Sequence, residues 1–113
     1  MGYFKHECLV VSGDYAAVTR AHGEACQLFD DIGYGRLVSG IKPHAVNCGA
    51  SFFVSPDGSK EGWEPSNKCA EARGALVVHL RTTSLEWALI LLGGDDEEFR
   101  VIDSPTGSQA SEG

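Results

Sequence analysis

Several features that assign proteins to familiar classes are missing from this chain of 113 residues. Its longest purely apolar run, residues 87–92, is far shorter than the roughly 20 residues of a membrane-spanning helix. No long apolar core follows the first few residues, so we expect no signal peptide. We therefore expect a cytoplasmic protein that does not enter a membrane.

Basic side chains are scarce, because nine Lys and Arg stand against sixteen Asp and Glu, for a net charge of −7. Nucleic-acid binding depends on basic side chains that displace counterions from phosphates, so we expect no direct nucleic-acid contact. The acidity serves solubility in ordinary proteins; the alternatives are mimicry of a nucleic-acid backbone and pairing with a basic partner. Residues 95–98, all acidic, are typical of a solvated hairpin tip, or else form a docking point for such a partner.

Metal-binding signatures are also missing. The four cysteines lie far apart without a C-x-x-C pair: Cys8, Cys26, Cys48 and Cys69. Without an export signal, we expect them to be reduced. His44 lies close to Cys48 in the sequence, but two candidate ligands do not make a zinc site. Residues 57–68 partly match a calcium loop, but Lys68 stands where the twelfth position needs glutamate. We expect no metal and no cofactor.

Catalytic motifs are missing in the same way. The sequence has no G-x-S-x-G elbow, no phosphate-binding P-loop and no G-x-G-x-x-G. No histidine is followed two residues later by Ser or Thr, which excludes the paired H-x-T/S motifs of 2H phosphodiesterases. A binding protein is therefore favoured over an enzyme. If there is catalysis, His44, in a loop of turn-forming residues, is the histidine to test.

Hydrophobic spacing predicts the secondary structure. Apolar residues at helical intervals predict one helix over 15–32, capped by Asp14, and a second that is capped by Ser66 or Asn67 and runs to about 81. The stretch 76–80 also fits a strand. Strands are predicted at residues 3–12, 37–41, 49–55, 86–92 and 98–103.

This order, β-α-β-β-α-β-β, contains the split βαβ, or ferredoxin-like, arrangement. We expect an α+β fold in which two helices cover one face of an antiparallel sheet and a C-terminal strand is added at its edge. Residues 1–103 then form a single domain and 104–113 a flexible tail. The second face of such a sheet is often open to water or to a partner. The fold by itself selects no function.

The loop over residues 57–66 is the most unusual segment. Asp57 opens a tight turn with Gly58, and successive backbone N–H groups in such a turn can bind an anion. Ser59 adds a hydroxyl, Lys60 a positive charge for phosphate, and Trp63 a flat face for a base. These residues predict a site for a nucleotide-like ligand.

Two residues of the preceding loop, His44 and Asn47, are added to this candidate site as further polar groups. The alternative is purely structural: Trp63 packs onto the second helix, and the rest of loop 57–66 is a solvated connection.

A family resemblance covers nearly the whole chain. The segments A-V-N (45–47), S-F-F-V (51–54) and P-D-G-S-K-E-G-W (56–63) resemble a small family of uncharacterised tailed-phage and prophage proteins. The first strand, with His6, and the G-G-D-D after the strand at 86–92 are similar too. The chain departs from the family's pattern at Cys48 and Pro65. The resemblance implies no established activity, but its phage context implies an accessory protein, in the host cytoplasm, that counters host defence.

Three functions follow as hypotheses. In the first, the protein is a non-catalytic binder that sequesters a nucleotide-like signal through residues 57–66. In the second, it inhibits a host defence or nucleic-acid-binding protein through its acidic surface and open sheet face. In the third, it is a small nucleotide-processing enzyme that uses His44. A homo-oligomer is possible in each, because small ligand-binding domains often build their site across a dimer interface.

Overall fold

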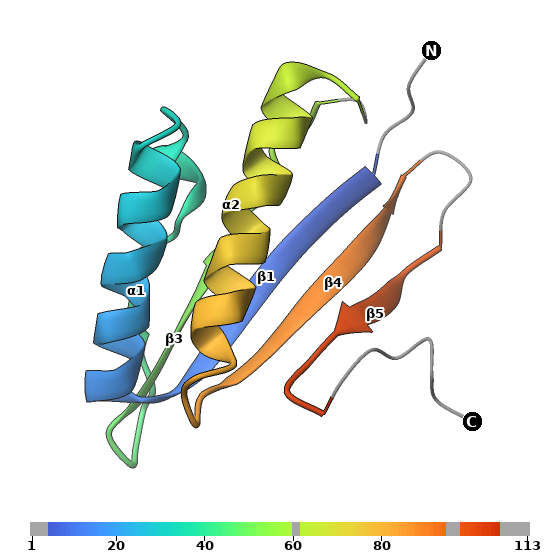
Figure 1. Cartoon of the computed structure of the whole chain (residues 1–113). Coiled ribbons are helices and arrows are strands. Elements are labelled where there is room, and N and C mark those ends of the chain that lie inside the picture. The colour runs from blue at the N-terminus through green and yellow to red at the C-terminus, as the bar shows by residue number, and fades with distance from the viewer. Residues whose placement is uncertain (1–4, 60–61, 95–97, 107–113) are drawn as a thin grey trace.

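The computed structural model describes residues 5–59, 62–94 and 98–106 (Figure 1). Its elements, in chain order, are β1 (Lys5–Asp14), α1 (Tyr15–Asp30), a short 3-10 helix (Gly35–Leu37), β2 (Lys42–Pro43), β3 (Gly49–Val54), α2 (Glu64–Leu80), β4 (Glu86–Gly94) and β5 (Arg100–Asp103). None of the described helices is long and apolar enough to cross a bilayer.

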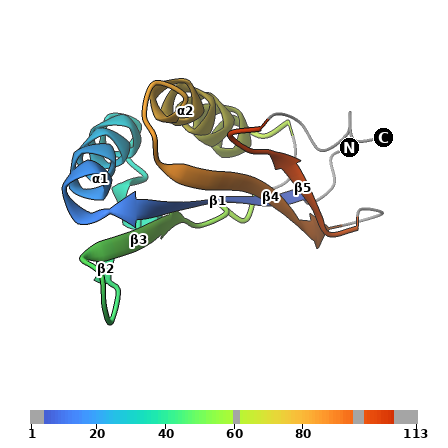
Figure 2. The ribbon, with the colours of Figure 1, turned by 90° about the horizontal axis from the view of Figure 1, so that it is seen from below.

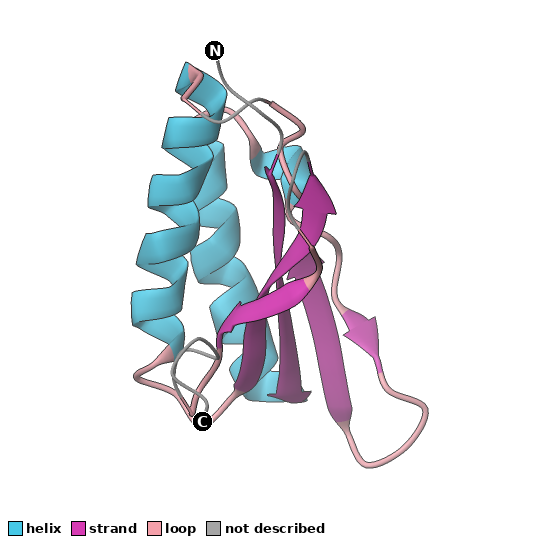
Figure 3. Cartoon of the chain, turned by 90° about the vertical axis from the view of Figure 1, so that its right-hand side faces the viewer, coloured by secondary structure: helices cyan, strands magenta, loops and turns pink. Residues whose placement is uncertain are grey.

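The five strands form one sheet in the order β2-β3-β1-β4-β5, and every neighbouring pair is antiparallel. Both helices lie on the same side of this sheet, as Figures 2 and 3 show. Each helix connects two strands that are not neighbours in the sheet. Helix α1 connects β1 to β2, with β3 between them, and α2 connects β3 to β4, with β1 between them. The predicted ferredoxin-like α+β fold, including the added strand β5, is confirmed.

Helix α1 begins where the sequence predicts. The Asp14 carboxylate accepts hydrogen bonds from the backbone N–H groups of Ala16 and Ala17 at 3.1 and 3.2 Å, which satisfies two amides that have no partner within the helix. The helix buries Val18, Ala21, Ala25 and Phe29, the spacing of one helical face.

The core lies between the helices and one face of the sheet. Alternate strand residues point into it, among them Leu9 and Val11 of β1, Phe52 and Val54 of β3, and Trp87 of β4. Helix α2 covers them with the buried residues Cys69, Ala72, Leu76, Val77 and Leu80. Because strand side chains alternate between faces, the intervening residues of β1, β3 and β4 point to the side without helices.

The predicted strand at 37–41 is wrong. Leu37 ends the 3-10 helix, Val38 makes an isolated bridge to Val54, and β2 comprises only Lys42–Pro43. The cause is a contact with the neighbouring strand: the Ser39 side chain accepts the hydrogen bond of the Phe53 N–H at 2.8 Å, where a strand would offer a backbone carbonyl. The ladder along β3 is thereby interrupted at Ser39 and Gly40.

The predicted cap of the second helix, Ser66 or Asn67, is also wrong, since α2 begins at Glu64. Trp63 occupies the N-cap position without a side-chain capping hydrogen bond, and Pro65 lies in the first turn. Proline suits that turn because its missing N–H would have no partner there. The stretch 76–80 is helical, β4 extends to Gly94, and the predicted acidic turn at 95–97 lies outside the described residues.

Candidate functional site

Two of the predicted loop residues, Asp57 and Ser59, make contacts within the protein that fix the loop in place. The Asp57 carboxylate accepts hydrogen bonds from the backbone N–H of Ser59, at 3.1 Å, and from its hydroxyl. Its other oxygen lies 3.7 Å from Nη1 of Arg73, and both side chains are only 7% exposed. A second carboxylate, on Glu7, lies 3.7 Å from Nη2 of the same arginine. Asp57 therefore fastens the loop to α2 and, through Arg73, to β1.

The electrostatics of this cluster keep Asp57 ionised. Burial alone would raise the pKa of its carboxyl group, but the hydrogen bonds from Ser59 and the charge of Arg73 outweigh burial and lower it. The positive charge of Arg73 is thus matched by two carboxylates. Among the described residues of this cluster, an anionic ligand would meet more negative than positive charge.

The other two predicted site residues of the loop are Trp63 and Lys60. Trp63 is 53% exposed at the N-cap position of α2, so its side chain lies outside the buried core. Lys60 lies outside the described residues.

His44 and Asn47 lie far from this loop, since the length of β3 separates the β2–β3 hairpin from residues 55–59 (Figure 1). Asn47 and Cys48 both have left-handed backbone conformations, with φ of 67° and 53°. Asparagine adopts this conformation more readily than most other residues. Asn47 therefore shapes the turn, and the structure does not bring the six predicted site residues together.

His44 instead belongs to a hydrogen-bonded cluster on the side of the sheet without helices. Its Nε2 lies 2.7 Å from Oγ of Ser51 and 3.5 Å from Oγ of Ser12. The Ser51 hydroxyl donates to that of Ser12 over 3.0 Å. A Cβ at Gly49 would lie only 2.5 Å from Nδ1 of His44, so the ring needs glycine at this position.

The strand register extends this cluster into a row. Lys42 on β2 is directly opposite Ser51 on β3, Ser51 is opposite Ser12 on β1, and Ser12 is opposite Glu86 on β4. Cross-strand partners share a face of the sheet. We call these four residues the polar row.

An apolar row lies beside the polar row, two residues further along the strands. It consists of Phe53, Val10 and Ala88, which are opposite one another on β3, β1 and β4. Phe53 is 44% and Val10 37% exposed. The polar row and the apolar row together are called the open face below.

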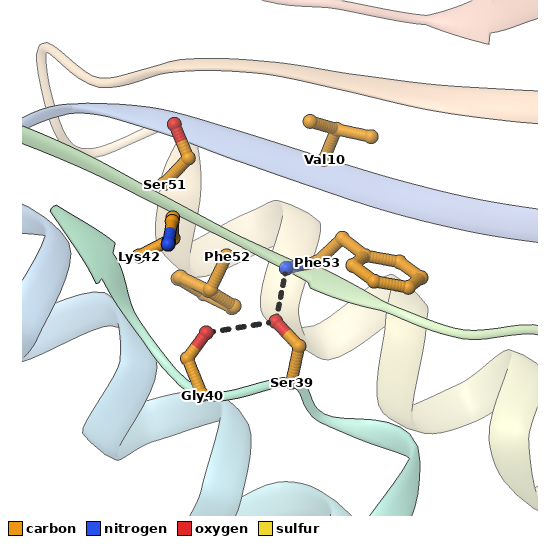
Figure 4. Close-up of a pocket in the computed structure, with 7 residues that line it drawn as sticks. All are labelled: Val10, Ser39, Gly40, Lys42, Ser51, Phe52 and Phe53. Atoms are coloured by element: carbon orange, nitrogen blue, oxygen red, sulfur yellow. Dashed lines mark hydrogen bonds between the residues drawn. The ribbon is translucent and has the colours of Figure 1, made fainter. Parts of the chain in front are cut away.

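Two shallow grooves lie side by side on the open face. The first, of about 400 Å³, is lined by Val10, Ser39, Gly40, Lys42, Ser51, Phe52 and Phe53 (Figure 4). The second, of about 290 Å³, is lined by Val10, Ser12, Glu86, Trp87, Ala88 and Ile90. The interruption at Ser39 and Gly40 forms one wall of the first groove, with Lys42 and Ser51 at its polar end (Figure 4).

Metal binding has no support among the described residues, which contain no group of three His, Cys, Asp or Glu side chains that could hold an ion. No protein-family model, curated protein or solved structure matches the chain. The resemblance to phage proteins stays a prediction.

Proposed function

We propose that this is a non-catalytic protein that binds a small organic anion with a flat, apolar body, and that the open face is its binding site. The observation that carries the proposal is the first groove, whose apolar lining ends at Lys42 and Ser51. Its volume of about 400 Å³ is within the range of small-molecule sites.

The apolar part of the groove fits the body of such a ligand, and the polar end fits its anionic group. The apolar body lies against Phe53 and Val10, whose side chains are partly exposed to water and would lose that contact on binding. The anionic group lies at the Lys42 ammonium and the Ser51 hydroxyl, which supply a charge and a hydrogen-bond donor. A nucleotide-like ligand meets this description, so the ligand class predicted from the sequence is retained while the site moves from loop 57–66 to the sheet.

Binding is favoured over catalysis by the surroundings of His44. Its Nε2 contacts Ser51, which is the pairing of a base with a hydroxyl nucleophile. No carboxylate among the described residues bonds the other ring nitrogen to orient the ring, and the side chain is exposed. The phage resemblance adds the expectation that binding sequesters a host signal.

Titration followed by nuclear magnetic resonance tests the site. The probes are nucleoside monophosphates, cyclic dinucleotides and aromatic carboxylates. We expect amide shifts concentrated at Val10, Ser51 and Phe53, and an affinity loss of roughly tenfold in Lys42→Ala, because a hydrogen bond to a charged group contributes about 1.5–3 kcal/mol.

The matched control is Lys68→Ala, which removes an exposed lysine from α2, paired with Glu64 at 3.4 Å; its affinity should stay unchanged. If no probe binds, the proposal is wrong. If Lys60→Ala abolishes binding and Lys42→Ala does not, the site is loop 57–66 instead.

A further inference from the structure

The polar row carries opposite charges at its two ends. Lys42 lies on β2 and Glu86 on β4, with the hydrogen-bonded pair Ser51 and Ser12 between them. At about 4.8 Å between neighbouring strands, the backbones of Lys42 and Glu86 are roughly 14 Å apart. The centre of the row lies between β3 and β1.

This arrangement is self-complementary. We propose that the open face binds the open face of a second copy of the chain, about a two-fold axis that runs parallel to the strands between β1 and β3. Rotation about that axis reverses the order of the strands and keeps position along them. Lys42 then faces Glu86 of the second copy, and Glu86 faces Lys42 of the second copy. Between them, the cluster of Ser51, Ser12 and His44 faces the same cluster of the second copy. Such an isologous contact forms a closed dimer.

The dimensions of stacked sheets allow these contacts. Two sheets pack about 10 Å apart, a gap that the extended side chains of one lysine and one glutamate together bridge. Stacked sheets are also rotated by about 30° because each sheet is twisted. At the ends of the row, roughly 7 Å from the axis, this rotation displaces facing residues by about 4 Å, which the flexible lysine side chain accommodates.

The apolar row is complementary under the same rotation. Phe53 faces Val10 of the second copy, so the partly exposed side chains of both copies become buried. The net charge of −7 opposes self-association in general, but the polar row itself contributes one lysine and one glutamate. The β2–β3 hairpin projects on the same side of the sheet (Figure 2).

Pairing uses the groups that the proposed ligand would contact. Lys42, Val10 and Phe53 line the first groove, and in the dimer the same side chains contact the second copy, so a ligand in this groove competes with dimerisation.

Sedimentation velocity over a range of protein concentrations, without any ligand, tests the pairing. We expect the wild-type protein to dimerise. Lys42→Glu places two glutamates opposite each other at both ends of the row, and Glu86→Lys places two lysines there. Each variant alone should therefore lose dimerisation by at least roughly tenfold in dissociation constant.

The decisive sample is an equal mixture of these two monomeric variants. In a mixed dimer every contact again joins a lysine to a glutamate, so we expect the mixture to form a heterodimer near the wild-type dissociation constant. The chain that carries both substitutions should form homodimers again. Recovery in the mixture is not explained by misfolding of either variant, and circular dichroism of each variant checks folding directly.

Matched controls are Glu64→Lys and Lys68→Glu, which make the same charge changes on an exposed ion pair of α2 and should leave dimerisation unchanged. A wild-type chain that stays monomeric at all concentrations overturns the pairing, as does a mixture that stays monomeric. Dimerisation without binding of any probe to monomeric Glu86→Lys contradicts the proposed function alone. A probe that binds the first groove without dissociating the dimer overturns the overlap of the two sites.

Discussion

Replacing Asp57 by asparagine tests whether loop 57–66 is a structural anchor. The Arg73 side chain is 7% exposed and lies 3.7 Å from both Asp57 and Glu7. Its Nε and Nη1 atoms have no hydrogen-bond partner among the described residues, so the two carboxylates compensate the charge by proximity. Asp57→Asn keeps the shape of the side chain and removes one of these charges.

The expected loss of stability follows from the burial of the pair. Removing one partner of a buried ion pair costs about 3–5 kcal/mol, because the other charge stays buried without compensation. Glu7, whose side chain is 28% exposed, remains beside Arg73 in the variant. We therefore expect a loss of stability at the lower limit of this range, about 3 kcal/mol. The Tm should fall by on the order of 10 °C.

Urea denaturation at several pH values measures this loss and its origin. Because the pKa of Asp57 is lower in the folded protein, its ionised form stabilises the fold above the unfolded pKa of about 3.9, and this contribution disappears as the pH falls through the folded pKa. The asparagine side chain of the variant does not titrate. The difference between wild type and variant should therefore be largest at neutral pH and narrow below pH of about 4.

The control is Glu64→Gln, which breaks the exposed ion pair with Lys68 and should cost less than about 0.5 kcal/mol. A cost below about 1 kcal/mol for Asp57→Asn would refute the anchoring role. A full cost that persists unchanged in acid would show that it does not come from the charge of Asp57.

Two further predictions concern the helix start and the cysteines. Asp14→Ala removes the acceptor of the Ala16 and Ala17 amides and should lower the free energy of unfolding by about 1 kcal/mol; an unchanged urea midpoint would contradict this. Burial raises the pKa of the Cys8 and Cys69 thiols despite the nearby Arg73, whereas Cys48 is exposed. Alkylation at neutral pH, followed by mass spectrometry, should modify Cys48 in the native protein and the two buried thiols only after unfolding, and equal rates would contradict the burial.

The element order was predictable because it depends on local signals. The helical spacing of Val18, Ala21, Ala25 and Phe29 and the capping residue Asp14 are all contained within one segment of the chain. The strand predicted at 37–41 failed because its outcome depends on a distant group. Ser39 bonds to Phe53, which is fourteen residues away, and residue spacing does not reveal that contact. For α2, by contrast, Pro65 was a usable signal, since proline favours the first helical turn.

The site was less predictable than the fold. Asp57 and Ser59 have the composition of an anion-binding loop, but the same composition builds a turn that its own side chains stabilise, and the charge that neutralises Asp57 is on Arg73, in a different element. The polar row joins residues from four strands. Its register depends on which strands pair, so the predicted strands that contain Ser12, Ser51 and Glu86 did not reveal that these residues share a row.

The positions of the two clusters make their roles separable. Arg73 and Asp57 lie on the helix side of the sheet and link α2 to the loop after β3, whereas Lys42 and Glu86 are exposed on the other side. Substitutions far apart without shared partners act independently. Asp57→Asn should therefore lower stability without weakening the dimer of the folded chain, and Lys42→Glu should do the reverse. A variant that did both would require the sheet to transmit strain from one face to the other. The buried residues of β1 and β3, which are packed on the helices, resist such strain because a close-packed core has no space into which to shift.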